Sequence, residues 1–249
     1  MKPNLHVCLT LSAAVALSSV LLGSGCASNS TKPAAADSTT PTPTSNRFVA
    51  TDGRIIDIGK SGSADGGMRY NNPHLEKGKC WVADGFNFNG YDTLYIAPTL
   101  STAKFPDKPE DTKVHELAKN NLALELSRMI GTRGIFAKVV TQESELKPGA
   151  KVLKMENTIT EFSKGGGAGR YFGGLYGGGQ PVLRVQGRMS DGEKTMFSYE
   201  ARRSGTSAGA RMGGAFMKDE DIQIEDVRSM ALDLSDFMAA IAGKYPPKN

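Results

Sequence analysis

The sequence predicts an α+β fold, a two-layer sandwich in which two helices cover one face of a mostly antiparallel sheet of about five strands. Two segments, 114–130 and 227–241, carry apolar residues at helical spacing. Three others alternate apolar and polar residues with the period of a strand, which gives the sheet one apolar and one polar face. They are 151–162, 181–191 and 194–204. The expected domain spans residues 90–245.

The first half of this domain is a strand followed by a helix. Residues 93–97 are rich in β-favouring side chains, and Pro98 stops the strand. Asp111 or Thr112 can cap the following helix, and Gly131 ends it. The apolar stripe of the helix consists of Val114, Leu117, Ala118, Leu122, Leu126, Met129 and Ile130.

The second half supplies four strands and a closing helix. The first of these strands is 135–141, and the three alternating segments follow it. Asp191-Gly192 is a hairpin signal between the last two strands. Acidic residues at 219–221 suit the positive N-terminal end of the closing helix, and Gly243 and Pro246 end it. Its apolar stripe consists of Val227, Met230, Ala231, Leu234, Phe237, Met238 and Ile241.

The N-terminal segment is expected to be a targeting signal rather than part of the fold. Residues 1–25 join a short polar start to an apolar stretch shorter than the roughly 20 residues of a transmembrane helix. The pattern LLGSGC ends at Cys26 and resembles the lipobox of bacterial lipoproteins, with Gly23 where Leu usually stands. We expect a lipoprotein signal peptide and lipid attachment at Cys26, and an ordinary cleaved signal is the alternative. By resemblance to enterobacterial sorting, Ala27 implies an outer-membrane anchor with the domain facing the periplasm.

A tether and an extension separate this anchor from the domain. Residues 26–46 are mostly Ser, Thr, Pro and Ala, which bury too little apolar surface to order the chain, so we expect a disordered tether. Residues 47–89 are expected to be an irregular extension containing one hairpin with a type I′ turn at Asp52-Gly53. Cys80 is the one cysteine left for the folded part, so it has no disulfide partner there and is expected to be a small buried hydrophobe.

Two glycine-rich stretches, 165–179 and 205–214, border the predicted strands. Antiparallel strands would bring both to the same end of the sheet, where we place the interaction site. In one interpretation they are loops that present aromatic side chains to a partner. In the other, glycines spaced by four form short helices that pack on each other or between copies, with Arg170 and Arg211 near lipid phosphates or an acidic partner. The candidate interaction residues are Gly165, Gly169, Arg170, Tyr171, Phe172, Gly173, Tyr176, Gly177, Gly205, Gly209, Arg211 and Gly213.

Several of these segments together resemble a bacterial lipoprotein family known only as a domain of unknown function (DUF4410-like). The resemblance covers YDTLYIAP, the helix after it, the glycine run with Arg170, the SDGEK turn and EARRSG, from about Tyr91 to Ile241. The element order is also similar to the periplasmic fold of penicillin-binding-protein activator lipoproteins and of the curli secretion lipoprotein. This likeness implies a fold and no activity.

The residue inventory favours a binding protein over an enzyme. It holds no paired histidines, Ser/His/Asp spacing, metal-ligand cluster or complete GxGxxG, so we expect no catalysis, metal or cofactor. His115 is expected to be an exposed surface residue. The net charge of +4 is spread along the chain, which argues against nucleic acid. We expect a membrane anchor through the lipid and a protein that binds or assists another envelope component. A self-associating scaffold or pore and, less favoured, an envelope hydrolase are the alternatives.

Overall fold

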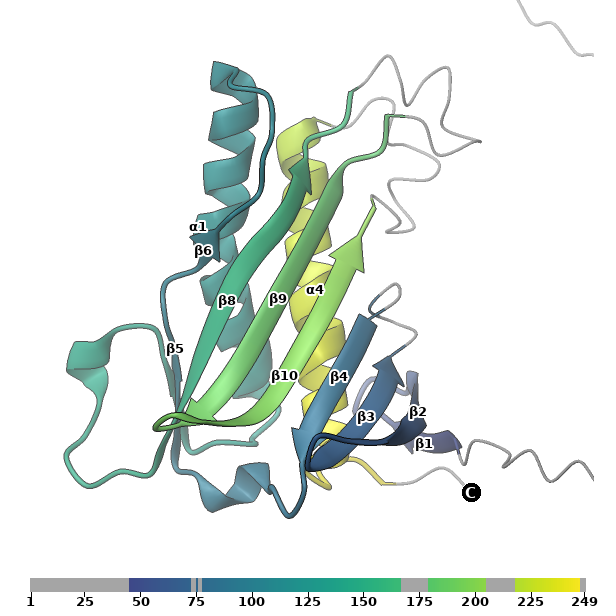
Figure 1. Cartoon of the computed structure of the whole chain (residues 1–249), viewed down its shortest axis with the longest axis vertical. Helices are drawn as coiled ribbons and strands as arrows, with labels where there is room; N and C mark the ends of the chain where they lie inside the picture. Colours follow the sequence, from purple (N-terminus) through teal and green to yellow (C-terminus); the bar gives the residue numbers. More distant parts are fainter. Residues whose placement is uncertain (1–44, 73–74, 76–77, 167–178, 205–217, 247–249) are drawn as a thin grey trace, which may run out of the picture. The chain divides into compact units, whose positions relative to one another are not determined.

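The computed structural model describes residues 45–72, 75, 78–166, 179–204 and 218–246, with the side chains of 45 and 46 left out. All of them belong to one compact unit, Thr42–Asn249. Two long helices, α1 (Pro109–Thr132) and α4 (Asp219–Ile241), pack against each other and cover the same face of a sheet (Figure 1). The α+β class and the arrangement of both helices on one face are as the sequence predicts.

The described sheet has ten strands rather than about five. In spatial order the strands are β1-β2-β3-β4-β10-β9-β8-β5-β7, and β6 pairs with β8. The pairs of β5 with β7 and β8, and of β6 with β8, are parallel, and the others are antiparallel. The strands are β1 (Ser45–Val49), β2 (Ile55–Ala64), β3 (Gly67–Asn72), β4 (Gly78–Ala83), β5 (Thr93–Ile96), β6 (Leu100–Ser101), β7 (Lys138–Val140), β8 (Val152–Ser163), β9 (Val182–Asp191) and β10 (Lys194–Arg203).

The additional strands come mainly from residues 47–89, which corrects the expectation of an irregular extension. This segment forms four antiparallel strands, and β4 continues the sheet by pairing with β10. The small hairpin is confirmed, because Val49 pairs with Ile55. Its turn is not type I′, which needs positive φ at both central residues, since Gly53 has φ +83° and Asp52 has no positive φ. The pairing leaves five residues, 50–54, in the loop, which closes with the Gly53 N–H donating to Ala50 O at 2.9 Å.

Both helices begin and end for local reasons. Pro109 occupies the first turn of α1, and Lys108, not Asp111 or Thr112, is its N-cap. The helix continues one residue past Gly131, and Gly134 then turns the chain with φ +61°. Helix α4 starts with three acidic residues, as predicted. It ends in a Schellman motif at Gly243 (φ +70°), with Lys244 N–H donating to Ala239 O.

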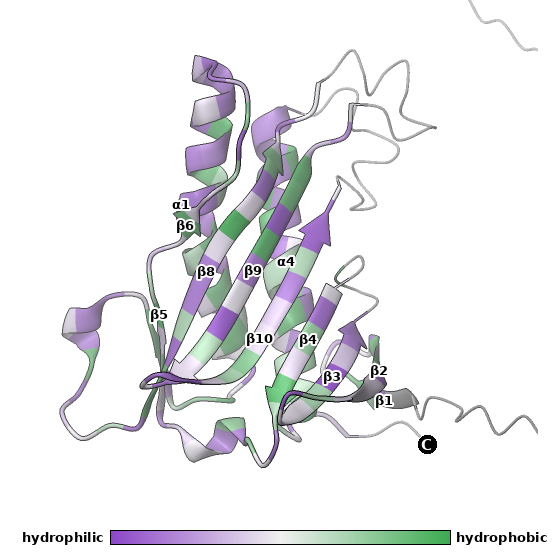
Figure 2. Ribbon diagram, in the orientation of Figure 1, coloured by the Kyte–Doolittle hydropathy of each residue, from purple (hydrophilic) through white to green (hydrophobic). Residues whose placement is uncertain are grey.

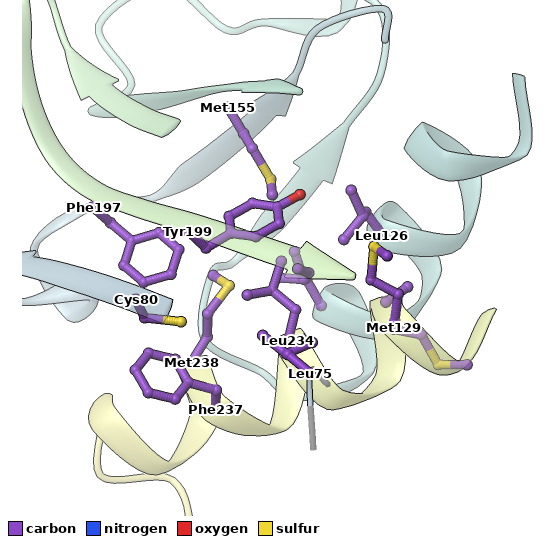
Figure 3. Packing of buried hydrophobic residues seen from close by; sticks show 14 of the residues in the cluster. Leu75, Cys80, Leu126, Met129, Met155, Phe197, Tyr199, Leu234, Phe237 and Met238 are labelled. Atoms are coloured by element: carbon purple, nitrogen blue, oxygen red, sulfur yellow. The ribbon is translucent and has the colours of Figure 1, made fainter. Parts of the chain in front are cut away.

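The core lies between the sheet and the two helices (Figure 3). Strands β8, β9 and β10 turn alternate side chains toward it, whereas their other side chains face away from the helices. Figure 2 shows the matching alternation of hydrophilic and hydrophobic residues along these strands. Side chains from both layers meet there, including Met155, Phe197 and Tyr199 from the sheet and Leu126, Leu234, Phe237 and Met238 from the helices.

One buried charge cluster ties the ends of several elements together. Asp236 on α4 is fully buried, accepts hydrogen bonds from the guanidinium group of Arg54 and the hydroxyl of Tyr245, and forms an ion pair with Arg133. The Arg133 Nη2 to Asp236 Oδ1 distance is 2.8 Å, and the Tyr245 hydroxyl lies 2.6 Å from the same oxygen. The loop between β1 and β2, the end of α1 and the C-terminal segment therefore all contact the carboxylate of Asp236.

Candidate interaction surface

Most of the sequence-predicted site lies outside the described residues. This holds for Cys26 with the signal and tether, and for every candidate in the glycine-rich stretches except Gly165. What the structure does place are the strand ends that border both stretches. The end of β8 pairs with the start of β9 (Ser163 with Val182), and the end of β10 pairs with the same part of β9 (Arg203 with Leu183). The three strand ends that carry the two stretches thus lie side by side (Figure 1).

Gly165 sits where the first stretch leaves the sheet. Its φ of +76° is a backbone conformation that residues with a side chain rarely adopt. A Cβ at this position would overlap Gly179 O and lie 2.7 Å from Pro181 N. The Gly166 N–H donates to Gly179 O at 2.9 Å, so the two ends of the stretch are joined at its base.

The helix starts hold this base in place. Lys164 Nζ lies 3.5 Å from Asp111 Oδ1 at the start of α1, and the Gln223 amide on α4 donates to Ser163 O at 3.0 Å. The two helices are themselves linked by Lys113 and Glu220, 2.7 Å apart. The hydrogen bond from Lys113 lowers the pKa of Glu220. The starts of both helices therefore hold the strand ends that border the glycine-rich stretches, and we call this end of the sheet the platform.

His115 is buried, which corrects the expectation of an exposed residue. Its Nε2 lies 2.8 Å from Ser101 Oγ on β6, and its ring packs on Phe105 and Phe162. Burial lowers the pKa of His115, against the opposing effect of Glu116. The imidazole sits beside the apolar stripe on α1, and the β6 segment and the end of β8 cover it. Neither contact was readable from helical spacing alone.

The face of the sheet opposite the helices carries a cavity of about 920 Å³, which the sequence alone does not predict. It is lined by the middle residues of β3, β4, β10, β9 and β8, by β6 with Thr102, and by Ser61 of β2. Charged groups line it in pairs, such as Arg188 and Glu156 at 2.7 Å. The polar positions of the alternating strands were the available signal. The alternation within β8, β9 and β10 does not show that β3 and β4 extend the face of the sheet opposite the helices.

Trp81, on β4, lines this cavity together with Tyr70 and Tyr199, which belong to the buried core, whereas Trp81 does not. Its indole N–H donates to Ala64 O at 2.9 Å. The ring lies over Gly67, where a Cβ would come within 2.6 Å of the indole nitrogen. Cys80, its neighbour, points into the core as predicted, and burial raises the pKa of its thiol.

Within the described ranges, no group of three or more His, Cys, Asp or Glu side chains could hold a metal ion. No helix there is long and apolar enough to cross a membrane.

Comparisons with known proteins give distant structural likenesses. No family model and no curated protein matches the chain. The PelC dodecamer from Paraburkholderia phytofirmans is 13% identical, with a TM-score of 0.38 over 62% of this chain and 96% of that chain. Protein XCC0632 from Xanthomonas campestris, of family DUF330, is 9% identical, with a TM-score of 0.33 over 61% and 86%. Hypothetical protein CT253 from Chlamydia trachomatis is 10% identical, with a TM-score of 0.32 over 60% and 99%. Likenesses this distant assign the chain neither a family nor an activity.

Proposed function

We propose that the chain is a lipid-anchored protein of the outer membrane whose domain faces the periplasm and binds or helps to assemble another envelope component. It acts without catalysis, through the glycine-rich end of its sheet. The observation that carries the proposal is the side-by-side position of the strand ends at Ser163, Val182 and Arg203. Two long stretches with few side chains start from one braced edge, so a partner can contact both at once.

The expected anchor and tether would suit this role. Cys26 would hold the chain at the membrane, because several acyl chains on one residue bind far more firmly than one chain does. The tether expected at residues 26–46 would have a mean span of roughly 25 Å and would let the domain reorient. The platform would then present its glycine-rich end to components of the membrane or the periplasm.

Site-specific photocrosslinking in cells tests the proposal. A photoreactive residue is placed at Tyr171 or Arg211, and as a control at Glu193, an exposed residue in the turn at the opposite end of the sheet. We expect one defined adduct from positions 171 and 211 and none from 193. Equal labelling at all three positions, or no adduct at the glycine-rich end, would refute the proposed surface.

A self-associating scaffold is the competing form of the same proposal. Its sequence signal is the spacing of four between Gly165, Gly169, Gly173 and Gly177. Gly169→Leu with Gly173→Leu should dissociate an oligomer held by that face, as sedimentation would show. An adduct between two copies in the crosslinking experiment, lost in this variant, would assign the site to self-association.

A further inference from the structure

The cavity on the uncovered face is a trough that runs across the strands. Each of β3, β4, β10 and β9 contributes three consecutive residues from its middle, β8 contributes the alternate residues Glu156, Thr158 and Thr160, and β6 closes the row. Neighbouring strands lie about 4.8 Å apart, so six strands give a trough roughly 24 Å long. These strands face the viewer in Figure 1, with both helices behind them. An elongated ligand fits this shape better than a compact one.

The register lines up polar side chains along the trough. One row across the sheet consists of residues that are register partners on neighbouring strands. In order, they are Thr158, Gln186, Glu200, Lys79 and Asn71. Hydroxyl, amide and carboxylate groups in a row can donate and accept hydrogen bonds along an extended ligand. The backbone groups beneath them are engaged in the sheet. A peptide lying across the strands therefore finds no free edge with which to form a β-ladder.

The charges in the trough leave one cation in excess. Arg69 pairs with Asp65 at 2.9 Å, and Glu200 lies 3.5 Å from Arg184. Glu156 pairs with Arg188. Lys79 is exposed, and among the described residues its ammonium group has neither an ion pair nor a hydrogen bond. The lining thus offers a free cation and no free carboxylate, which complements an anionic group on the ligand.

The second row supplies an aromatic surface beside that cation. Its register partners on neighbouring strands are, in order, Arg188, Ser198, Trp81 and Arg69. The hydrogen bond to Ala64 O and the packing on Gly67 fix the indole plane, so little side-chain entropy is lost when a ligand packs on it. Trp81 is one row from Lys79 on the same face.

We propose that this trough binds an acidic oligosaccharide. A sugar ring packs its C–H face on Trp81, its carboxylate pairs with Lys79, and neighbouring hydroxyl groups bond to Gln186 and Asn71. A glycan matches the combination of a fixed aromatic plane, planar polar side chains and a single free cation. An acidic peptide would use the cation and leave the aromatic plane and the amide row unexplained.

Trp81 is the only tryptophan of the chain, so its fluorescence reports on the trough alone. The purified full chain in detergent is titrated with hexagalacturonate, with neutral maltohexaose and with hexaglutamate. We expect a saturable change with hexagalacturonate that weakens at high salt, and at least tenfold weaker binding of the other two. No saturable change up to millimolar hexagalacturonate would overturn the proposal, as would equal binding of maltohexaose. Equal binding of hexaglutamate would replace the glycan by an acidic peptide and overturn the proposal too.

Matched lysine variants locate the binding site. Lys79→Gln should weaken hexagalacturonate binding about tenfold, the effect of losing one charge-assisted hydrogen bond. Lys147→Gln removes an exposed charge from the loop before β8 and should leave binding unchanged. Equal losses in both variants would show a diffuse charge effect and overturn the assigned site. The outcome is independent of the crosslinking at residues 171 and 211, because that experiment tests the glycine-rich end of the sheet and not the trough.

Discussion

Gly187 in the middle of β9 provides a sharp test of how side chains pack on the core face of the sheet. The phenol hydroxyl of Tyr199 donates to Asn157 Oδ1 at 2.8 Å, and both residues are buried. Tyr199 belongs to β10 and packs in the core with Phe197 and Met155 (Figure 3). A Cβ on Gly187 would overlap the Tyr199 ring edge and lie 2.7 Å from Asn157 Oδ1. Glycine is therefore required at this position for the buried pair to form.

Two opposing effects make the sign of Gly187→Ala informative. Alanine alone would stabilise a strand interior by about 0.5–1 kcal/mol, because glycine loses more backbone entropy on folding. The overlap with the Tyr199 ring should cost about 1–3 kcal/mol. Displacing the hydroxyl from Asn157 leaves buried polar groups unpaired and should cost a similar amount. Together these effects give an expected net loss of about 1–5 kcal/mol in the free energy of unfolding.

Urea unfolding followed by circular dichroism measures this loss. Gly131→Ala is the matched control, because a Cβ there meets nothing within 4 Å and the residue lies in a helix. The control should gain up to about 1 kcal/mol. If Gly187→Ala were as stable as the parent, or gained stability like the control, the described packing of Tyr199 against Gly187 would be wrong.

Three further variants test other parts of the molecule. Burial lowers the pKa of His115 below its ordinary value of 6.5, so the unfolded chain gains a proton that the folded chain resists as pH falls through 6.5. The Tm of the parent should therefore drop more steeply from pH 7.5 to 5 than that of His115→Gln, and parallel slopes would contradict the buried neutral imidazole. Asp236→Asn leaves the guanidinium of Arg133 without its buried anion and should cost about 3–5 kcal/mol in urea unfolding, and a loss below about 1 kcal/mol would show a dispensable cluster. Cys26→Ala should move the protein from the membrane to the soluble fraction and abolish acyl labelling, and unchanged fractionation would exclude the lipid anchor.

The second half of the fold was readable from the sequence because its signals are local. Strands β8, β9 and β10 alternate over most of their length, and the Gly192 turn (φ +58°) joins the last two. The stripes of α1 and α4 are long enough to specify which face is buried. These patterns depend on neighbours within one element, so composition and spacing were sufficient.

The first half of the sheet was missed because its signal is not local. Residues 59–72 have the Gly, Ser and Asn content of a loop, yet they form most of β2 and all of β3. A register shift near Gly62 accommodates this sequence in the ladder. What makes the segment a strand is pairing with β4, which is itself held by β10, more than a hundred residues away. No window of neighbouring residues contains that information.

The candidate sites divide in the same way. The sequence predicted that the strand ends bordering the glycine-rich stretches would meet, because antiparallel order alone requires it. It could not place Lys79 beside Glu200 or Trp81 beside Ser198, since these pairs depend on the register between β4 and β10. It also misjudged His115, whose cover comes from Ser101 and Phe162 on other elements.

By itself, then, the sequence determined the two amphipathic helices and the meander of three strands, and it predicts a membrane anchor at Cys26. Each follows from hydrophobic periodicity or turn chemistry within a short segment. The tertiary structure alone decided that β1–β4 extend the sheet and that the uncovered face is a trough. It also decided which charges in that trough are paired and which one is free. Long-range strand pairing sets these features, because the hydrogen bonds and contacts that stabilise them join residues far apart in the chain.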